Sequence, residues 1–297
     1  QYWFRYNNKH ILEEELTFFK DMGGRLSTHS SLLFSRTGND EVKFGASFKG
    51  PRAQVRKTVG LRPNALLLSA AAAAGIECVQ PVFSFFQNDM AYCVANAFEQ
   101  EQPILLDQFK NKTPFSKHLT SLIKYADFGI SDVKSVPANI PSDIWHQFKE
   151  LMKTQIGADE GKLEEAFNIK NATQLQFTHT GEDSSSAGFG LDNESRGTVA
   201  ALSFFSLALR QLSRPTVTLI DEIDTSLHPT LVAELVALYT DPATNPHGSQ
   251  LIFTTHDVSL INQSGSSNRL LQPDQIWLVE KDKDGASELF PVTELGI

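Results

Sequence analysis

Cysteine and long hydrophobic runs are both scarce in this sequence of 297 residues. Its two cysteines, Cys78 and Cys93, lie in apolar surroundings without CxxC spacing, so neither a structural zinc site nor a disulfide framework is expected. No apolar run reaches the roughly 18 residues of a membrane-spanning helix, and the start of the chain has the pattern of a strand instead of a signal peptide. We therefore expect reduced core thiols in a cytoplasmic protein that does not enter a membrane.

Basic residues are outnumbered by acidic ones. The chain carries 26 Lys and Arg against 35 Asp and Glu, for a net charge of -9. This balance argues against extensive wrapping of nucleic acid and leaves only a local basic patch open. Hydrophobic residues make up 41% and charged residues 21% of the chain, as in ordinary globular proteins. The length is sufficient for two lobes.

Strand patterns dominate the start of the chain and predict antiparallel sheet. Residues 1–6 and 11–18 form a predicted hairpin around Asn7 and Asn8, because Asn tolerates the positive φ of tight turns. Two further strands are predicted over 31–36 and 41–45. We assign residues 1–60 to an antiparallel β part of the fold.

Helical spacing replaces the strand patterns over residues 61–172. Helices are predicted over 65–74, with Gly75 as its stop, and over 79–97, 115–125 and 144–153. This segment contains no glycine-rich phosphate loop, and we assign it to an inserted helical lobe.

Strands and helices alternate in the last segment, residues 173–297. This alternation predicts an α/β fold with a parallel, doubly wound sheet over 190–265. The predicted elements are strand 174–180, a loop over 181–188, helix 199–212, strand 216–220, helix 230–238, strand 250–254 and a hairpin of 275–280 with 288–292.

Two adjacent carboxylates, Asp221 and Glu222, follow the apolar strand 216–220. Open α/β sheets bind ligands at the carboxyl ends of their strands, and two acids there indicate a hydrated metal beside a phosphate. His256 stands at the end of the next strand, where a core or capping role is the simpler interpretation of an isolated histidine. Ser195 begins a helix whose N–H groups can bind a phosphate, although a plain N-cap is the alternative.

The segments ESRGT, LIDE and TTHD, in this order, resemble the signature motif, the Walker B motif and the switch histidine of ABC-type ATPase heads. The stretches IDEIDTSLHP, FTTHD and DQIWLVEKDKDGASEL are similar to AAA family ATPases of bacterial abortive-infection and anti-phage systems, a group close to overcoming-lysogenization-defect and SMC-like heads. The resemblance is specific over residues 185–292. It implies an ABC-type P-loop NTPase head with an antiparallel β subdomain and an inserted helical lobe.

The resemblance also implies a site for ATP and Mg²⁺. Asp221 would bind Mg²⁺, through water, and Glu222 would polarise the water that attacks the γ-phosphate. His256 would contact the γ-phosphate and sense its loss. Phosphoryl transfer needs positioning and charge neutralisation more than covalent help, which fits these residue types.

In such heads the signature motif serves the nucleotide of the opposite protomer. Ser195, Gly197 and Thr198 would then contact ATP held by a partner, and Asp224 would begin the loop that links the two sites across the interface. Function would require a homodimer that encloses two ATP molecules. We assign no role to Arg196, which stands where the signature more often has a small or acidic residue.

The expected function is that of a sensor or regulatory ATPase in anti-phage defence. It would control a separate effector protein such as a nuclease or toxin, with DNA or a phage component as a further candidate partner. One alternative is a DNA-repair or recombination ATPase that clamps DNA. Another is a non-catalytic scaffold, against which Asp221, Glu222 and His256 argue.

One motif of the family is missing from the sequence. No GxxxxGK[ST] occurs in the 297 residues, so the loop that would cradle the phosphates is absent. Either a Walker A segment lies upstream of Gln1, or the head is degenerate and cannot bind ATP alone. A start inside a strand favours the first explanation.

Overall fold

A computed structural model describes residues 1–38, 41–93, 98–126, 129–138, 172–181, 185–262 and 270–295, with a few single positions between 143 and 154. The chain divides into two compact units, Gln1–Met90 and Ala91–Ile297. The three-part division expected from the sequence, with boundaries at 60 and 172, stays a prediction. The predicted helix over 144–153 lies largely outside the described residues.

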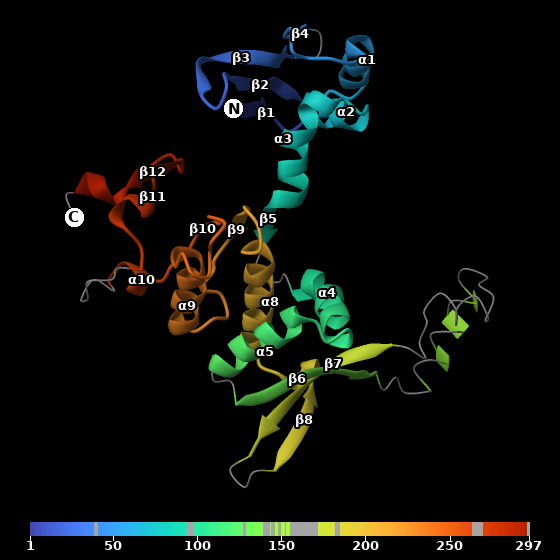
Figure 1. Cartoon of the computed structure of the whole chain (residues 1–297), viewed down its shortest axis with the longest axis vertical. Helices are drawn as coiled ribbons and strands as arrows, with labels where there is room; N and C mark the ends of the chain where they lie inside the picture. The colour runs from blue at the N-terminus through green and yellow to red at the C-terminus, as the bar shows by residue number, and fades with distance from the viewer. Residues whose placement is uncertain are drawn as a thin grey trace. The chain divides into compact units, whose positions relative to one another are not determined.

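The first unit is built on a four-stranded antiparallel sheet in the order β1-β2-β3-β4 (Figure 1). The predicted hairpin and the two following strands are confirmed, with bounds β1 Tyr2–Tyr6, β2 Ile11–Asp21, β3 Leu26–Thr37 and β4 Glu41–Phe44. Strand β2 alternates buried and less buried positions along part of its length, as expected for a strand with one face on a core.

Two helices complete the core of the first unit. Helix α2, Leu67–Ala73, is confirmed, and Gly75 follows it with a φ of 72°. Helix α1, Arg52–Leu61, occupies a stretch that we expected to belong to the β part. Val55 and Val59 of α1 are fully buried in the same cluster as Phe34 and Leu67. Packing against the sheet stabilises this segment as a helix. Local sequence patterns do not reveal that packing.

A buried ion pair joins the sheet to α2. Glu14 and Arg36 have fully buried side chains, with Nη1 of Arg36 3.9 Å from Oε2 of Glu14. The Glu14 carboxylate also accepts the backbone N–H groups of Leu67 and Leu68, at 2.6 and 2.9 Å, and so caps the helix. Burial raises the pKa of the Glu14 carboxyl, and these hydrogen bonds only partly oppose it. Breaking such a pair leaves one charge buried without its partner.

The second unit contains a three-stranded sheet in the order β10-β9-β5. Its strands are β5 Met90–Cys93, β9 Val217–Ile220 and β10 Gln250–Phe253, and β10 runs parallel to β9. Helix α8, Arg196–Gln211, precedes β9, and helix α9, Pro229–Thr240, lies between β9 and β10 along the chain. The predicted α/β alternation in this region is therefore confirmed.

A second sheet in this unit is antiparallel, in the order β6-β7-β8. Its strands are β6 Ile130–Pro137, β7 Thr173–Thr180 and β8 Ser186–Gly190. Helices α4, Phe98–Lys110, and α5, Pro114–Tyr125, pack against this sheet, and α8 packs against both helices (Figure 1).

Three of these strands contradict the sequence-based expectations. Residues 90–93 form β5 instead of continuing a helix over 79–97, of which α3, Gln80–Ser84, and a π-helical turn, Phe85–Asp89, are present. Strand β6 lies in the segment expected to be helical, and β8 occupies part of the expected loop. Each is short and is stabilised by pairing with a strand distant in sequence or across a turn, which periodicity alone does not reveal.

Of the remaining elements, only the C-terminal hairpin was predicted from the sequence. The hairpin of β11, Trp277–Lys281, with β12, Ser287–Pro291, is confirmed. Helix α10 spans Ser259–Asn262, and short 3₁₀ segments lie at Glu77–Val79, Leu191–Asn193, Pro273–Gln275 and Val292–Leu295. Among the described residues, no helix combines the length and apolarity that crossing a membrane requires.

We predict that Arg36→Leu unfolds the first unit at lower urea concentration, with a loss of about 3–5 kcal/mol in its free energy of unfolding, because the Glu14 carboxylate is left buried without a counter-charge. The local readout is amide hydrogen exchange at Leu67 and Leu68, whose N–H groups Glu14 accepts. Lys43→Leu is the matched control, since its ion pair with Glu41 lies on the surface. Equal effects of the two substitutions would contradict the role of the buried pair.

Candidate functional site

The carboxyl ends of β9 and β10 lie at the same edge of their sheet. Ile220 and Phe253 are register partners at the ends of the two parallel strands. The backbone pairing continues past both strands, with Thr254 N–H donating to the carbonyl of Ile220 and Ile223 N–H donating to that of Thr254, each at 3.0 Å. The loop that carries Asp221 and Glu222 is therefore joined to the loop that carries His256.

Thr254 orients the two carboxylate-bearing residues. Its hydroxyl donates to Oδ1 of Asp221 at 2.7 Å and accepts the backbone N–H of Glu222 at 2.8 Å. The N–H of Asp221 donates to the carbonyl of Cys93 at the end of β5, at 3.2 Å. No role was predicted for Thr254 from the sequence, because its bonds to Asp221 and Glu222 form only where the two strand ends meet.

Glu222 adopts an unusual backbone conformation for a residue with a side chain. Its φ is 52°, in the left-handed region that costs about 1–2 kcal/mol for residues other than glycine. Its Oε2 accepts the hydroxyl of Thr225 at 3.2 Å, and its Oε1 lies 3.8 Å from Nε2 of His256. Both side chains are largely exposed, so this contact stabilises little. Strained residues of this kind concentrate at functional sites.

Asp224 forms a second link between the same two loops. Its Oδ1 accepts the hydroxyl of Thr255 at 2.7 Å and the backbone N–H of His256 at 3.3 Å. Burial alone would raise the pKa of this carboxyl, but these donors, its own N–H and the nearby His256 outweigh burial and lower the pKa. Within one chain, Asp224 therefore positions the backbone of His256. Its expected role across a dimer interface stays a prediction.

The signature segment begins α8 as expected. Ser195 is the N-cap, and its Oγ accepts the N–H of Thr198 at 3.0 Å and lies 2.9 Å from the Thr198 hydroxyl. A Cβ on Gly197 would lie 3.2 Å from the carbonyl oxygen of Ser226. The start of α8 thus lies against the loop that follows Glu222. The capping interpretation of Ser195 is confirmed, and its role in binding phosphate stays a prediction.

A histidine that sequence analysis did not select anchors the residue before the signature serine. Nε2 of His179 on β7 lies 2.8 Å from Oε1 of Glu194, whose side chain is almost fully buried. The His179 ring also makes an edge contact with Phe189, with ring centroids 5.2 Å apart. This pair ties the antiparallel sheet to the start of α8. No local pattern in the sequence indicated it.

The available donors suit a metal that shares its ligands with a phosphate. Among the described residues, no three His, Cys, Asp or Glu side chains are grouped so as to hold a metal ion. Mg²⁺ needs only one or two carboxylates when phosphates and water supply the other oxygens. The exposed Asp221 carboxylate, with Oδ1 held by Thr254, is a hard oxygen ligand of this type.

A parallel strand edge with two consecutive carboxylates, beside the N-terminus of a buried helix, is suited to a phosphate-bearing ligand and its metal ion. The family model described as "AAA domain, putative AbiEii toxin, Type IV TA system" matches residues 103–262, more than half of the chain. The chain belongs to this family. The matched range contains Ser195, Asp221, Glu222 and His256. No curated protein matches the chain.

We predict that Thr255→Val raises the pKa of the Asp224 carboxyl toward its ordinary value, because the hydroxyl that lowers it is removed. The carboxylate form would then be lost at higher pH during acidification than in the wild type. The measurement is an NMR titration of the Asp224 carboxyl carbon. Thr225→Val, which removes a hydroxyl bound to Glu222, serves as the control and should leave the Asp224 titration unchanged.

Proposed function

We propose that the edge formed by β9 and β10 is half of a Mg²⁺-dependent ATP-hydrolysing site. The observation that carries this proposal is the bridge made by Thr254, which holds Asp221 and the backbone of Glu222 together at the carboxyl end of a parallel sheet. Membership of an AAA family supports an ATPase-type function. ATP with Mg²⁺ supplies the phosphoryl group and the positive charge that neutralises its oxygens.

Three residues of this chain would have separate roles in the reaction. Asp221 would hold the metal through an oriented carboxylate. Glu222 would orient the attacking water and accept its proton, since its exposed carboxylate leaves room for a water molecule. His256, held through its backbone by Asp224, would donate a hydrogen bond to the terminal phosphate.

The second half of the site would come from a partner protomer. Ser195, Gly197 and Thr198 present the N-terminus of α8, whose N–H groups and dipole favour an anion. Their position against Ser226 supports a shared interface, because the signature segment and the loop from Asp224 to His228 would face the partner together. The 297 residues contain no Walker A motif, so within them the proposed site has its acidic edge and signature segment without a phosphate-cradling loop.

The biological role that fits best is regulation in abortive-infection defence. The description of the matching family names the AbiEii toxin and a type IV toxin–antitoxin system. We infer that ATP binding and hydrolysis control a separate effector, such as a nuclease or toxin, through assembly and release of the homodimer. In this scheme the ATPase acts as the sensor of the defence system.

For the complete gene product, Glu222→Gln should lower ATP hydrolysis by about 100-fold or more, because the group that accepts the water proton is lost. ATP binding should persist, and the ATP-bound dimer should accumulate. Steady-state phosphate release and size-exclusion chromatography with ATP measure the two effects. Glu280→Gln, on the exposed strand β11, is the charge-matched control. Hydrolysis at the wild-type rate in Glu222→Gln would refute the proposed role.

A composite site makes a prediction about mixtures. Ser195→Glu and Glu222→Gln should each abolish hydrolysis, but a mixed dimer has one site with both native residues. Random mixing of equal amounts should therefore restore about a quarter of the wild-type rate, since half of the dimers are mixed and each has one intact site. Phosphate release from the mixture measures this. A mixture as inactive as its components would show that the signature acts on its own protomer, and full activity of Ser195→Glu alone would show that it has no role.

A further inference from the structure

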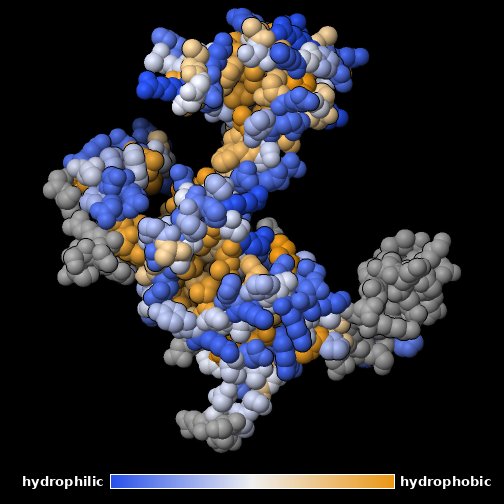
Figure 2. Space-filling view, viewed as in Figure 1, coloured by the Kyte–Doolittle hydropathy of each residue, from blue (hydrophilic) through white to orange (hydrophobic). Residues whose placement is uncertain are grey.

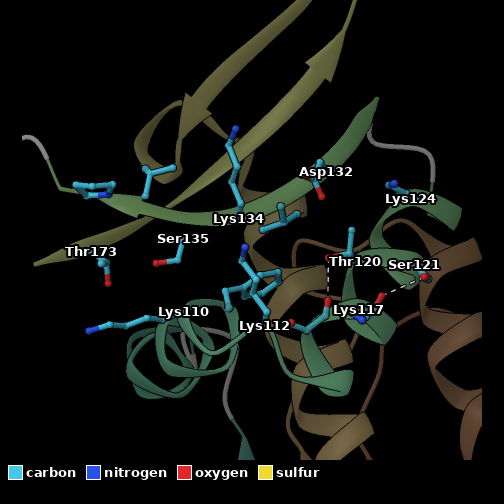
Figure 3. Close-up of a pocket in the computed structure, with 15 residues that line it drawn as sticks. Lys110, Lys112, Lys117, Thr120, Ser121, Lys124, Asp132, Lys134, Ser135 and Thr173 are labelled. Carbon is cyan, nitrogen blue, oxygen red and sulfur yellow. Dashed lines mark hydrogen bonds between the residues drawn. The ribbon is translucent and has the colours of Figure 1, made fainter. Parts of the chain in front are cut away.

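A hollow of about 560 Å³ lies between β6 and the helices α4 and α5. The charged residues along it are Lys110, Lys112, Lys117, Lys124, Lys134 and Asp132, and of these Lys134 points away from the helices (Figure 3). The whole chain has a net charge of -9, so the local excess of positive charge here is opposite in sign to the net charge of the chain. The surface over β6 is largely hydrophilic (Figure 2). None of the lining residues belongs to the edge formed by β9 and β10.

One face of α5 supplies much of this lining. Lys117, Thr120, Ser121 and Lys124 follow the i, i+3, i+4, i+7 spacing of a single helical face, and all four line the hollow. The two lysines are therefore about 10 Å apart along the helix. The hydroxyls of Thr120 and Ser121 donate to backbone carbonyls of their own helix (Figure 3). The lysine ammonium groups are thus the donors available to a ligand on this face.

Lys112 contributes a further cation at a conformational cost. It follows the end of α4 with a φ of 48°, a conformation that favours glycine or asparagine after a helix. Glycine would remove the steric strain at this position, whereas lysine keeps the strain and adds a positive charge. Strained residues of this kind cluster at functional sites and ligand clamps.

Asp132 is the one acidic residue of the lining, and it forms no ion pair with these lysines among the residues that the structure describes. None of the five forms an ion pair there with a carboxylate. Ser135 lies on the side of β6 that faces the helices, and Lys134 lies on the other side (Figure 3). The Oγ of Ser135 is buried without a hydrogen-bond partner among the described residues.

We infer that this hollow, the lysine pocket, binds a run of phosphate groups. The phosphates belong either to the polyphosphate of a nucleotide or to the backbone of a nucleic acid strand, and both present several anionic oxygens to separate ammonium groups. The volume lies in the range of small-ligand sites, and the two α5 lysines can contact phosphates that are not adjacent. The pocket is distinct from the proposed ATPase edge and does not depend on it.

The test measures binding of inorganic tripolyphosphate by calorimetry and of a short fluorescein-labelled oligothymidylate by anisotropy, both at low salt. The paired substitution Lys117→Ser with Lys124→Ser should weaken oligothymidylate binding about tenfold or more and reduce the slope of log affinity against log salt by about 1.4, or about 0.7 for each lost phosphate contact. Lys49→Ser with Lys57→Ser makes the same charge change at exposed positions of the first unit and should have little effect.

Lys112→Gly separates binding from folding. Glycine adopts a φ of 48° without steric cost, so the melting temperature should not fall while affinity for both probes does. Glu222→Gln should bind both probes as the wild type does, even though the ATPase proposal expects it to lose hydrolysis.

The two probes also distinguish the sources of phosphate. Mutual displacement with comparable affinity would identify a nucleotide polyphosphate, and much tighter binding of the oligothymidylate would identify a nucleic acid backbone. The inference is wrong if neither probe binds, if the α5 substitutions leave binding unchanged, or if the Lys49 and Lys57 substitutions weaken it equally.

Discussion

The candidate site depends on the hydrogen bonds by which Thr254 joins the ends of β9 and β10. Parallel pairing brings Ile220 opposite Phe253, and Thr254 extends that pairing to the Asp221 side chain and the Glu222 backbone. A second connection, from Asp224 to Thr255 and His256, runs between the same loops. Acidic residues and a histidine on separate loops are therefore held as one group, as preorganised catalysis requires.

Helix α8 links this edge to the rest of its unit. Its N-terminus lies beside the loop after Glu222, and most of its length is buried in one core cluster. Farther along, Ser206 donates to Oε2 of Glu101 on α4 at 3.0 Å, and Arg210 pairs with the same carboxylate. Because α8 also packs against α5, the helices that form the lysine pocket rest on the helix that begins with the signature serine.

The features that were predicted correctly are those that depend on residues close together in the sequence. The buried strand before Asp221 and Glu222, the apolar helix that became α8 and the hairpin of β11 with β12 were all correctly predicted. Strand β5 was missed, because four residues carry little periodicity and their pairing with β9 is a long-range contact. Thr254 and the pair of His179 with Glu194 were missed for the same reason, since their roles exist only once distant segments meet.

Gly197 constrains how this site can change during evolution. Any side chain there would press against the carbonyl oxygen of Ser226, and Ser226 is itself in the left-handed region with a φ of 67°. A substitution at position 197 therefore requires the loop after Glu222 to shift by a few tenths of an ångström. Homologous sequences should vary at these two segments jointly. Departures from glycine would then mark lineages in which the loop, and with it the geometry of the acidic edge, has been rebuilt.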